Sequence, residues 1–394
     1  MVSERMLGLG TARSVIRELF EYGKQRAAIV GPENVFDFSI GNPSVPAPPQ
    51  VNEAAIRLLQ SQDPTILHGY TSAQGDAGVR KALADNLNSR FGTDYTGDDL
   101  YVTVGAAAAL CCCFHGLACP GDEFVVIAPY FPEYKVFIEG SGAAMKLVQP
   151  FADTLQIDPE ALAAAIGPHT KAVVVNSPNN PSGVIYTADT LKAVAAVLEA
   201  KSAEYGHPVY LISDEPYREI VFEGYTVPWL PSIYKDTIVC YSFSKSLSLP
   251  GERIGYVLVP KQASDSGQVY AAVAGAGRSL GYVNAPSLFQ RVAAECCGLT
   301  SDISIYERNA QLLVTSLREM GYECVQPQGA FYLFLKTLEP DDLAFSMKAR
   351  EYDLLLVPGS GFGSAGWVRL AFCVQTEMIQ RALPKFRALA DAYK

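Results

Sequence analysis

Long apolar runs and clusters of basic residues are missing from this chain of 394 residues. No segment reaches the 18 or so consecutive apolar residues of a membrane-spanning helix, and the N-terminus lacks the apolar core of a signal peptide. Lys and Arg number 31 against 41 Asp and Glu, which gives a net charge of −10 without any basic run. These absences argue against a membrane protein and against a surface for nucleic acid or anionic lipid.

Metal-ligand spacing is also missing. The four His are scattered, and no Cys-x-x-Cys pair occurs among the nine Cys, so we predict no metal site. Cys111 to Cys113 are adjacent in one apolar stretch, and Cys296 and Cys297 are adjacent in another. We interpret the cysteines as thiols buried in a cytoplasmic protein, where thiols stay reduced, and assign none of them a catalytic role.

The composition and the patterning indicate a folded α/β protein. Hydrophobic residues make up 49% of the chain and charged residues 18%, which excludes a disordered chain. At about 100–200 residues per domain, the length allows two or three domains. From about Leu100, short apolar runs alternate with helix-length segments, which predicts a mostly parallel sheet between helices. The predicted strands are Leu100–Val104, Phe124–Ile127, Ala172–Val175, Val209–Ile212 and Thr237–Tyr241.

The two ends of the chain have a different pattern. The first fifty residues contain a predicted helix at about Ala12–Tyr22 and a Pro-rich extended stretch, Gly41–Pro49. The last hundred contain a helical stretch of roughly Ala285–Met320, strand-like runs at Ala330–Lys336 and Trp367–Phe372, and a helix from about Gln375. We therefore predict one α/β domain over residues 50–285 and a smaller α+β domain over residues 286–394.

The densest cluster of polar side chains follows the predicted strand Thr237–Tyr241. Hydroxyl residues, Lys245 and Arg253 lie together between Ser242 and Gly255. Ligands of α/β sheets bind at such strand ends, and hydroxyls with an Arg fork suit a phosphate. A lysine whose amine is neutral can form a Schiff base with a carbonyl. Taken alone, the segment is also compatible with an ordinary polar loop.

Four other features each allow a functional and a structural interpretation. The run Asn176–Gly183 is a turn by default, and Asp214 with Tyr217 suits either a ring ligand or a capped turn. Gly105, at a strand-to-helix junction, suits an anion site or a common α/β turn. Arg369, inside an apolar strand, needs a partner, which is either an incoming carboxylate or an internal acid.

Taken together, these parts resemble the class I/II aminotransferases, which are fold type I pyridoxal-phosphate enzymes. The resemblance rests on Asn-Pro-x-Gly at 180–183, Asp-x-x-Tyr at 214–217, Ser-x-Ser-Lys at 242–245 with an Arg eight residues on, and the late Arg369. It covers nearly the whole chain from Gly41 onward. It implies that residues 1–49 join the small domain, so that the large cofactor-binding domain is a central insertion.

The resemblance implies roles for the chemically active side chains. Lys245 matches the lysine that holds pyridoxal 5'-phosphate as an internal aldimine and then moves the substrate proton. Asp214 matches the partner of the pyridine nitrogen, and Asn180 and Tyr217 match donors to the cofactor 3-oxygen. The implied activity is a ping-pong transfer of an amino group between an L-amino acid and a 2-oxo acid.

The remaining matches concern binding. The implied phosphate ligands are Ser242, Ser244, Arg253 and the backbone N–H groups of Ala106 and Ala107. Phe131 matches the aromatic that stacks on the ring, although it also suits a core position. Tyr70 matches a tyrosine contributed by the neighbouring subunit, so the resemblance implies a homodimer. Arg369 matches the clamp for the α-carboxylate, and Gly41, Asn42 and Asn180 match the substrate pocket.

One position departs from the family pattern. Many bacterial aspartate aminotransferases of this subgroup carry a Lys in the loop where this chain reads Gly105-Ala106-Ala107-Ala108. Ala107 cannot bind a distal carboxylate, so the resemblance leaves aspartate specificity open, while it still implies glutamate and 2-oxoglutarate as one substrate pair. Arg278 lies near the place where other relatives supply a distal-carboxylate Arg from the neighbouring subunit, and that alternative stays open.

Two other activities fit parts of the same pattern. A carbon–sulfur β-lyase or an eliminase similar to aminocyclopropane-carboxylate synthase shares the cofactor residues, because the cofactor carries the difficult chemistry. A non-enzymatic aminotransferase-like domain of a transcription regulator would need a DNA-binding domain ahead of it. The chain has only about fifty residues there, and its acidic balance opposes DNA binding.

Overall fold

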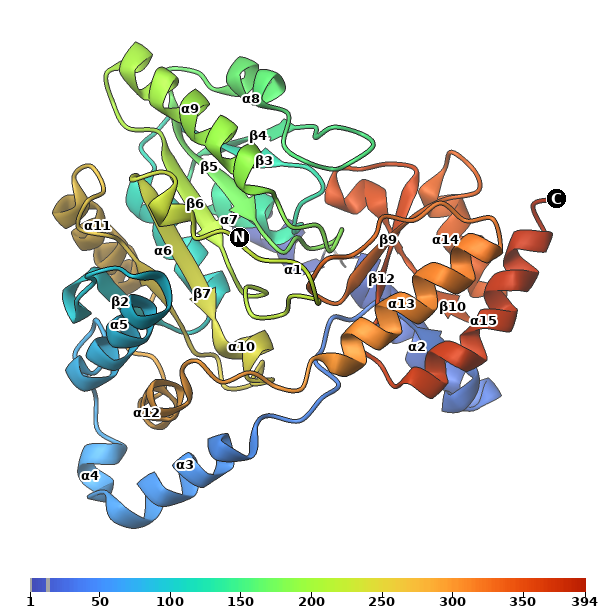
Figure 1. Cartoon of the computed structure of the whole chain (residues 1–394), viewed down its shortest axis with the longest axis horizontal. Coiled ribbons are helices and arrows are strands. Elements are labelled where there is room, and N and C mark those ends of the chain that lie inside the picture. The colour runs from blue at the N-terminus through green and yellow to red at the C-terminus, as the bar shows by residue number, and fades with distance from the viewer. Residues whose placement is uncertain (1, 12–14) are drawn as a thin grey trace.

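A seven-stranded sheet forms the centre of the larger part of the molecule (Figure 1). The computed structural model describes residues 2–11 and 15–394. The strand order is β2-β8-β7-β6-β5-β3-β4, in which β8 runs antiparallel to both of its neighbours and β7, β6, β5, β3 and β4 pair in parallel. The strands are β2 (Leu100–Thr103), β3 (Glu123–Ile127), β4 (Ala144–Val148), β5 (Thr170–Asn176), β6 (Tyr210–Asp214), β7 (Thr237–Ser242) and β8 (Gly255–Leu258). This confirms the predicted α/β class with a mostly parallel sheet.

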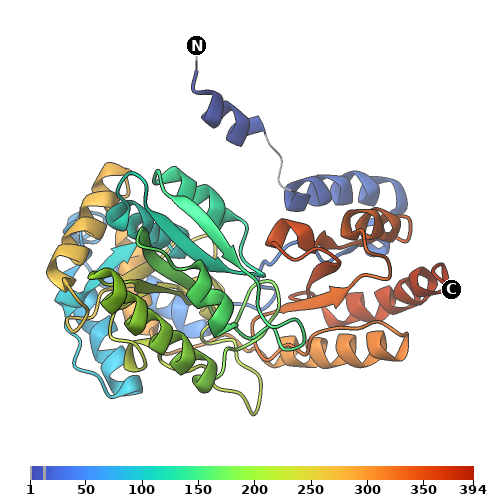
Figure 2. The ribbon, with the colours of Figure 1, turned by 90° about the horizontal axis from the view of Figure 1, so that it is seen from above.

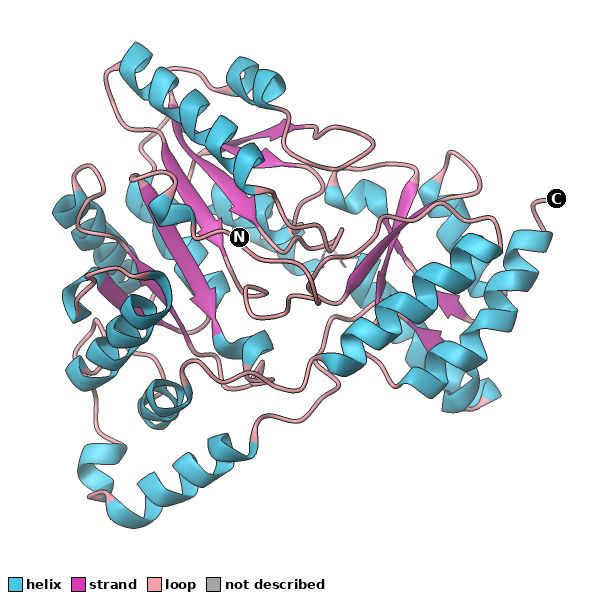
Figure 3. Ribbon diagram, in the orientation of Figure 1, coloured by secondary structure: helices cyan, strands magenta, loops and turns pink. Residues whose placement is uncertain are grey.

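Helices cover both faces of this sheet (Figure 3). Alternate residues of a strand enter different cores: Phe124 and Val126 pack with α6, α7 and α11, whereas Val125 and Ile127 pack with α8 and α9. Burial on both faces explains why these strands read as continuous apolar runs. A third core lies between β2, β7 and β8 and the helices α3, α5 and α12. The helices of this part are α3 (Pro49–Ser61), α4 (Pro64–Leu67), α5 (Ala77–Phe91), α6 (Ala106–Leu117), α7 (Glu133–Gly140), α8 (Pro159–Ala165), α9 (Ala188–Tyr205), α10 (Phe243–Ser246), α11 (Ser266–Ser279) and α12 (Ser287–Cys296).

The smaller part is built from both ends of the chain (Figure 2). Its antiparallel sheet has the order β11-β12-β9, and β1 pairs in parallel with β10, so residues 36–37 lie beside residues 354–355. One core joins Phe36 and Phe38 to the C-terminal helices. The elements are α2 (Val15–Val30), β1 (Phe36–Asp37), α13 (Ser304–Glu319), β9 (Tyr332–Lys336), α14 (Asp342–Arg350), β10 (Leu354–Leu355), β11 (Val357–Pro358), β12 (Trp367–Ala371) and α15 (Thr376–Asp391). Helix α1 (Glu4–Thr11) stands apart from the smaller part in Figure 2, and none of its residues is buried. Short 3-10 turns are η1 (Pro32–Asn34), η2 (Gly97–Asp99), η3 (Leu230–Ser232) and η4 (Gly359–Phe362).

Several predicted boundaries were wrong. The stretch Ala285–Met320 is two helices, α12 and α13, separated by residues 297–303. Strands β4 and β8 were not predicted. The helix predicted at about Ala12–Tyr22 corresponds to α2, which extends further, to Val30, and α1 was not predicted. Residues 12–14 of the predicted span lie outside the described residues.

The position of α12 bears on the domain boundary. Val292, Ala293 and Cys296 pack into the core that contains α3 and α5, on the side of the large sheet. We therefore propose that the large domain runs from residue 50 to about residue 298, past the predicted boundary at 285, and that residues 2–11, 15–49 and 299–394 form the small domain. No helix in the described part of the chain is long and apolar enough to cross a membrane.

Candidate active site

A cavity of about 310 Å³ lies where three parallel strands of the large sheet end and the smaller part begins. Strands β5, β6 and β7 end at Asn176, Asp214 and Ser242, and each of these residues lines the cavity. The smaller part contributes Tyr332 from β9 and Arg369 from β12. Carboxyl ends of parallel strands meet at one edge of a sheet, which is where ligands of α/β folds bind.

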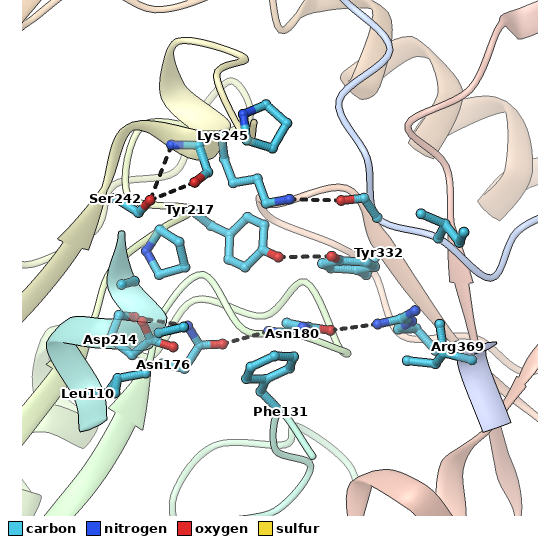
Figure 4. A pocket seen from close by; sticks show the side chains of 18 of the residues that line it. Leu110, Phe131, Asn176, Asn180, Asp214, Tyr217, Ser242, Lys245, Tyr332 and Arg369 are labelled. Atoms are coloured by element: carbon cyan, nitrogen blue, oxygen red, sulfur yellow. Dashed lines mark hydrogen bonds between the residues drawn. The ribbon is translucent and has the colours of Figure 1, made fainter. Parts of the chain in front are cut away.

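Lys245 projects into this cavity from α10, directly after β7 (Figure 4). Its Nζ donates a hydrogen bond of 2.8 Å to the carbonyl of Gly41, and no acid lies within ion-pairing distance among the described residues. Burial, together with the nearby charges of Arg253 and Arg369, lowers the pKa of Lys245 to about 8. Much of this amine is therefore neutral at mildly alkaline pH, as attack on a carbonyl requires.

Asp214 is the last residue of β6 and is almost fully buried. Its Oδ2 accepts a hydrogen bond of 2.5 Å from the hydroxyl of Tyr134, whereas its Oδ1 is buried without a partner. Burial raises the pKa of Asp214 to about 7, and the neighbouring carboxylate of Glu215 adds to the rise. A buried carboxylate oxygen without a donor is costly, so this site is prepared for a cationic or N–H ligand group.

A chain of hydrogen bonds crosses the cavity from Asp214 to Arg369 (Figure 4). Asn176 donates through Nδ2 to the Asp214 carbonyl at 2.9 Å and accepts from the backbone N–H of Asn180 at 2.7 Å. Asn180 in turn accepts from Nη1 of Arg369 at 3.2 Å. These hydrogen bonds connect Asp214, at one end of the site, to Arg369 at the other.

Arg369 is a buried cation, and no acid in the described part of the chain forms an ion pair with it. Its Nη2 donates to the Ser39 carbonyl at 2.5 Å, and its guanidinium lies over the rings of Tyr332 and Phe362, at 4.7 and 5.0 Å from their centroids. Its Nε is buried without a hydrogen-bond acceptor. Desolvation lowers the pKa of Arg369 from its ordinary value. An incoming carboxylate would satisfy both the charge and the free donor.

A second group of donors lies at the start of α6. Gly105 has φ +86°, a backbone conformation that favours glycine, and a Cβ at this position would lie 2.6 Å from Nη2 of Arg253 and displace it. Arg253 donates to Oγ of Ser244 at 3.3 Å, and the hydroxyls of Ser242 and Ser244 are 2.7 Å apart. Helix N–H groups, hydroxyls and a guanidinium together suit a phosphate.

Residues 33–386 match the family described as aminotransferase class I and II. The chain belongs to the class I and II aminotransferases. It is therefore an enzyme that transfers amino groups, in a family that uses pyridoxal 5'-phosphate.

Individual relatives agree with this assignment. The aminotransferase is 32% identical to the aspartate/prephenate aminotransferase of Thermus thermophilus, over 88% of each chain, and 30% identical to the aspartate aminotransferase of Thermotoga maritima, over 98% of each. A crystal structure of an amino transferase from Eubacterium rectale has 54% identity and a TM-score of 0.98, and covers 100% of this chain and 99% of that one. The Thermus thermophilus aspartate aminotransferase with maleate has 27% identity and a TM-score of 0.86, over 99% of each chain.

The cavity of this aminotransferase brings together most of the residues predicted for its site. Those that line it are Gly41, Ala106, Ala107, Phe131, Asn180, Asp214, Tyr217, Ser242, Ser244, Lys245, Arg253 and Arg369. Asn42 is exposed and does not line it. Tyr70 is 97% exposed and lies outside the cavity. Its predicted role concerned the neighbouring subunit, and it stays a prediction.

Sequence reasoning missed several residues of the aminotransferase site. Tyr332 shares a hydrogen bond of 2.8 Å with the hydroxyl of Tyr217 and stacks on Arg369. The position of Tyr332 in a predicted strand did not indicate that its side chain belongs to the site. Tyr134 was missed as the donor to Asp214, although it follows Phe131 by three residues. Asn176 opens the Asn-Pro run, and its place at a strand end was the available signal. The other unpredicted lining residues are Ile16, Ser39, Ile40, Leu110, Pro216 and Pro250.

Proposed function

We propose that this aminotransferase binds pyridoxal 5'-phosphate in the cavity at Lys245 and passes an amino group from an L-amino acid to a 2-oxo acid in a ping-pong cycle. The observation that carries the proposal is the pairing, in one cavity, of an amine with a lowered pKa and a buried carboxylate oxygen that lacks a donor. The first suits a cofactor aldehyde, and the second suits a protonated pyridine nitrogen.

The rest of the cavity has the donors that this cofactor needs. The phosphate fits the first turn of α6 with Ser242, Ser244 and Arg253, where Gly105 keeps the approach open. Phe131 lies beside the site in Figure 4, in position to pack on a ring. Asn180 and Tyr217 come from separate loops and are placed to donate to the ring oxygen. These residues therefore fit the group in size, charge and polarity.

When bound, pyridoxal 5'-phosphate supplies the electron-accepting ring that makes the substrate Cα–H acidic. The chain supplies the remaining functions. The amine of Lys245 would hold the cofactor aldehyde and would serve as the base for the Cα proton of the substrate. Asp214, whose Oδ1 lacks a partner, would pair with the ring nitrogen and would favour its protonated form. Burial strengthens this interaction, because the local dielectric is low.

Arg369 is proposed to bind the substrate α-carboxylate. Its free Nε and its Nη groups form the planar fork that binds a carboxylate through two hydrogen bonds. Asn180 and the Ser39 carbonyl hold the fork in place at 3.2 and 2.5 Å. The substrate is thereby oriented so that its Cα lies between Arg369 and Lys245.

Arg369→Gln is expected to raise KM for the amino acid by about 30- to 1,000-fold, because it removes one partner of a buried charge pair. The effect on kcat should be smaller. The KM of Arg369→Lys, which keeps the charge but loses the fork, should lie between that of the wild type and that of Arg369→Gln. Steady-state kinetics with one amino acid check this, and an unchanged KM in Arg369→Gln would assign the carboxylate to another residue.

A half-reaction screen tests the proposed function. Purified holoenzyme is mixed with each amino acid in the absence of a 2-oxo acid, and the visible absorbance of the bound cofactor is followed. An aminotransferase loses this absorbance and releases a 2-oxo acid that carries the substrate's own side chain. Release of pyruvate and ammonia from cysteine or cystathionine would instead favour the carbon–sulfur β-lyase. No spectral change with any amino acid would contradict both activities.

We also propose a homodimer, in which Tyr70 reaches the cofactor phosphate of the partner. Tyr70 projects from the surface, and Ile66 on the preceding helix α4 is 62% exposed. The loop after Tyr70 is anchored by Asn284, whose Nδ2 donates to the Thr71 carbonyl at 2.9 Å. Sedimentation should give a species of twice the 42.5 kDa chain mass. A monomer with full activity would refute this assembly.

A further inference from the structure

Tyr332 and Tyr217 form a hydrogen bond that links the smaller part of the molecule to the larger one. Tyr332 begins β9, and Tyr217 lies in the loop after β6. Their hydroxyl oxygens are 2.8 Å apart, both residues are buried, and Figure 4 shows the two hydroxyls pointing toward each other in the cavity. The proposed function uses Tyr217 as a donor to the ring oxygen of the cofactor but gives Tyr332 no role.

The surroundings of this pair hold both rings in place. The rings of Phe331 and Tyr332 lie nearly perpendicular to that of Tyr217, with centroids at 5.4 and 5.6 Å. The ring of Tyr332 also packs on the guanidinium of Arg369, its diagonal neighbour in the ladder of β9 and β12. A Cβ at Gly41 would overlap the Tyr332 hydroxyl, so the glycine leaves the space that this hydroxyl occupies. Tyr332 is therefore held in one orientation, with its hydroxyl toward Tyr217.

The number of protons decides which hydroxyl donates. Each phenol carries one proton and can give it to one acceptor. Burial raises the pKa of Tyr332 to about 12 and that of Tyr217 well above its ordinary value, so both keep their protons at neutral pH. Of the groups that face the pair, the charge of Arg369 opposes this rise of the pKa, whereas Cys373 and Asp214 add to it. When Tyr217 gives its proton to the ring oxygen, the bond between the two hydroxyls requires Tyr332 to be the donor.

We propose that Tyr332 is a positioning residue, which donates its hydroxyl proton to Tyr217 and so directs the Tyr217 proton to the ring oxygen of the cofactor. This role rests on the proposed function above. An O–H group whose oxygen accepts a hydrogen bond becomes a stronger donor itself. Tyr332 therefore acts on the cofactor through Tyr217, and it does so from the part of the molecule that also carries Arg369.

An absorbance titration of the holoenzyme tests this role without turnover. A stronger donor to the ring oxygen stabilises the form of the bound cofactor in which that oxygen carries more negative charge, and so lowers the pH at which the visible absorbance changes. Tyr332→Phe keeps the ring beside Arg369 and removes the donor. We expect its midpoint to lie about 0.4 to 1 pH unit above that of the wild type, as for the loss of one hydrogen bond. An unchanged or lower midpoint would overturn the proposal.

A double-variant cycle shows whether Tyr332 acts through Tyr217. Tyr217→Phe should raise the midpoint by itself, because it removes the donor to the ring oxygen. Addition of Tyr332→Phe to this variant should then move the midpoint by less than about 0.2 unit, since the Tyr332 proton has already lost its acceptor. Two shifts that add in full would show that Tyr332 reaches the cofactor by another route, and the positioning role would be wrong.

Tyr306→Phe is the matched control. The ring of Tyr306 packs against Phe331, its hydroxyl accepts from the Ser44 N–H at 3.2 Å, and it is not among the described residues that line the cavity. The midpoint of this variant should equal that of the wild type, and a rise as large as that of Tyr332→Phe would assign the shift to a general loosening around β9. Gly41→Ala should raise the midpoint, because its Cβ would displace the Tyr332 hydroxyl, and no rise there would contradict the proposal.

Kinetics separate Tyr332 from the carboxylate clamp and from the proposed function. KM for the amino acid should change less than about threefold in Tyr332→Phe, since the aromatic face beside Arg369 remains. If the wild type reacts in the half-reaction screen and Tyr332→Phe titrates as the wild type does, only the role of Tyr332 is wrong. A wild type that binds no pyridoxal 5'-phosphate, or reacts with no amino acid, refutes the proposed function itself.

Discussion

Lys245→Ala is expected to abolish transamination, with kcat reduced by at least about 10²–10⁴-fold, because the variant loses the amine that moves the substrate proton. The absorbance of the bound cofactor should also differ before any turnover, since residue 245 would no longer hold the cofactor. Both expected effects concern one side chain, whose pKa of about 8 allows both the neutral and the protonated amine at mildly alkaline pH. Stopped-flow spectra and steady-state rates measure the two effects separately.

Two variants show which property of Lys245 matters. Lys245→Arg keeps a positive charge that cannot be lost near neutral pH, so it should be as inactive as Lys245→Ala. Lys261→Ala removes an exposed lysine that pairs with Asp94 at 2.6 Å and should retain the normal rate. Circular dichroism establishes that each variant is folded. Sustained turnover in Lys245→Ala would exclude this residue as the proton carrier.

Asp214→Asn is expected to lower kcat by about 10²–10³-fold while stabilising the cofactor-free protein at neutral pH. The first effect follows from loss of the charge beside the ring nitrogen. The second follows from burial, which raises the pKa of Asp214 from 3.8 in the unfolded chain to about 7 in the folded one. The native carboxyl therefore holds its proton between about pH 4 and 7, where the unfolded one has lost it.

The sign of the pH effect follows from this difference. The stability that protonated Asp214 contributes is present below pH 4 and is lost as the pH rises through 7, and the total loss is on the order of 4 kcal/mol. Asn cannot titrate, so the variant avoids this loss. Thermal unfolding of cofactor-free protein should show similar stability for variant and wild type below about pH 4 and a more stable variant at pH 8. A difference that does not change with pH would contradict the shifted pKa.

Residues that carry charge or break regular structure were the ones that could be predicted from sequence. Lys245, Asp214 and Arg369 stand out because each follows or interrupts an apolar strand, where a charged side chain needs a reason to be present. Strands buried on both faces, such as β5 and β6, were visible as apolar runs for the same physical reason. The α/β class and the family could be predicted from these features.

Features that depend on long-range contact could not be predicted in this way. Strand β4 lies at the edge of the sheet and is half-exposed, so it lacks a continuous apolar run. Tyr332 belongs to the site only because β9 brings its hydroxyl to that of Tyr217, 115 residues away along the chain. The shifted pKa of Asp214 likewise depends on burial by elements that are separate in sequence.

The order in which the site's parts occur along the chain has a consequence for synthesis on the ribosome. The last strand of the large sheet, β8, is complete at Leu258, whereas Arg369 follows 111 residues later (369 − 258). At about 5–20 residues per second, roughly 5–20 s separate the two events. Throughout that interval the nascent chain contains Lys245 and the turn at Gly105 but not Arg369, the proposed clamp for an amino acid. The pairing of β1 with β10 also cannot form until residues 354–355 have been synthesised. Residues 36–37 therefore cannot take their final position until most of the chain has been translated.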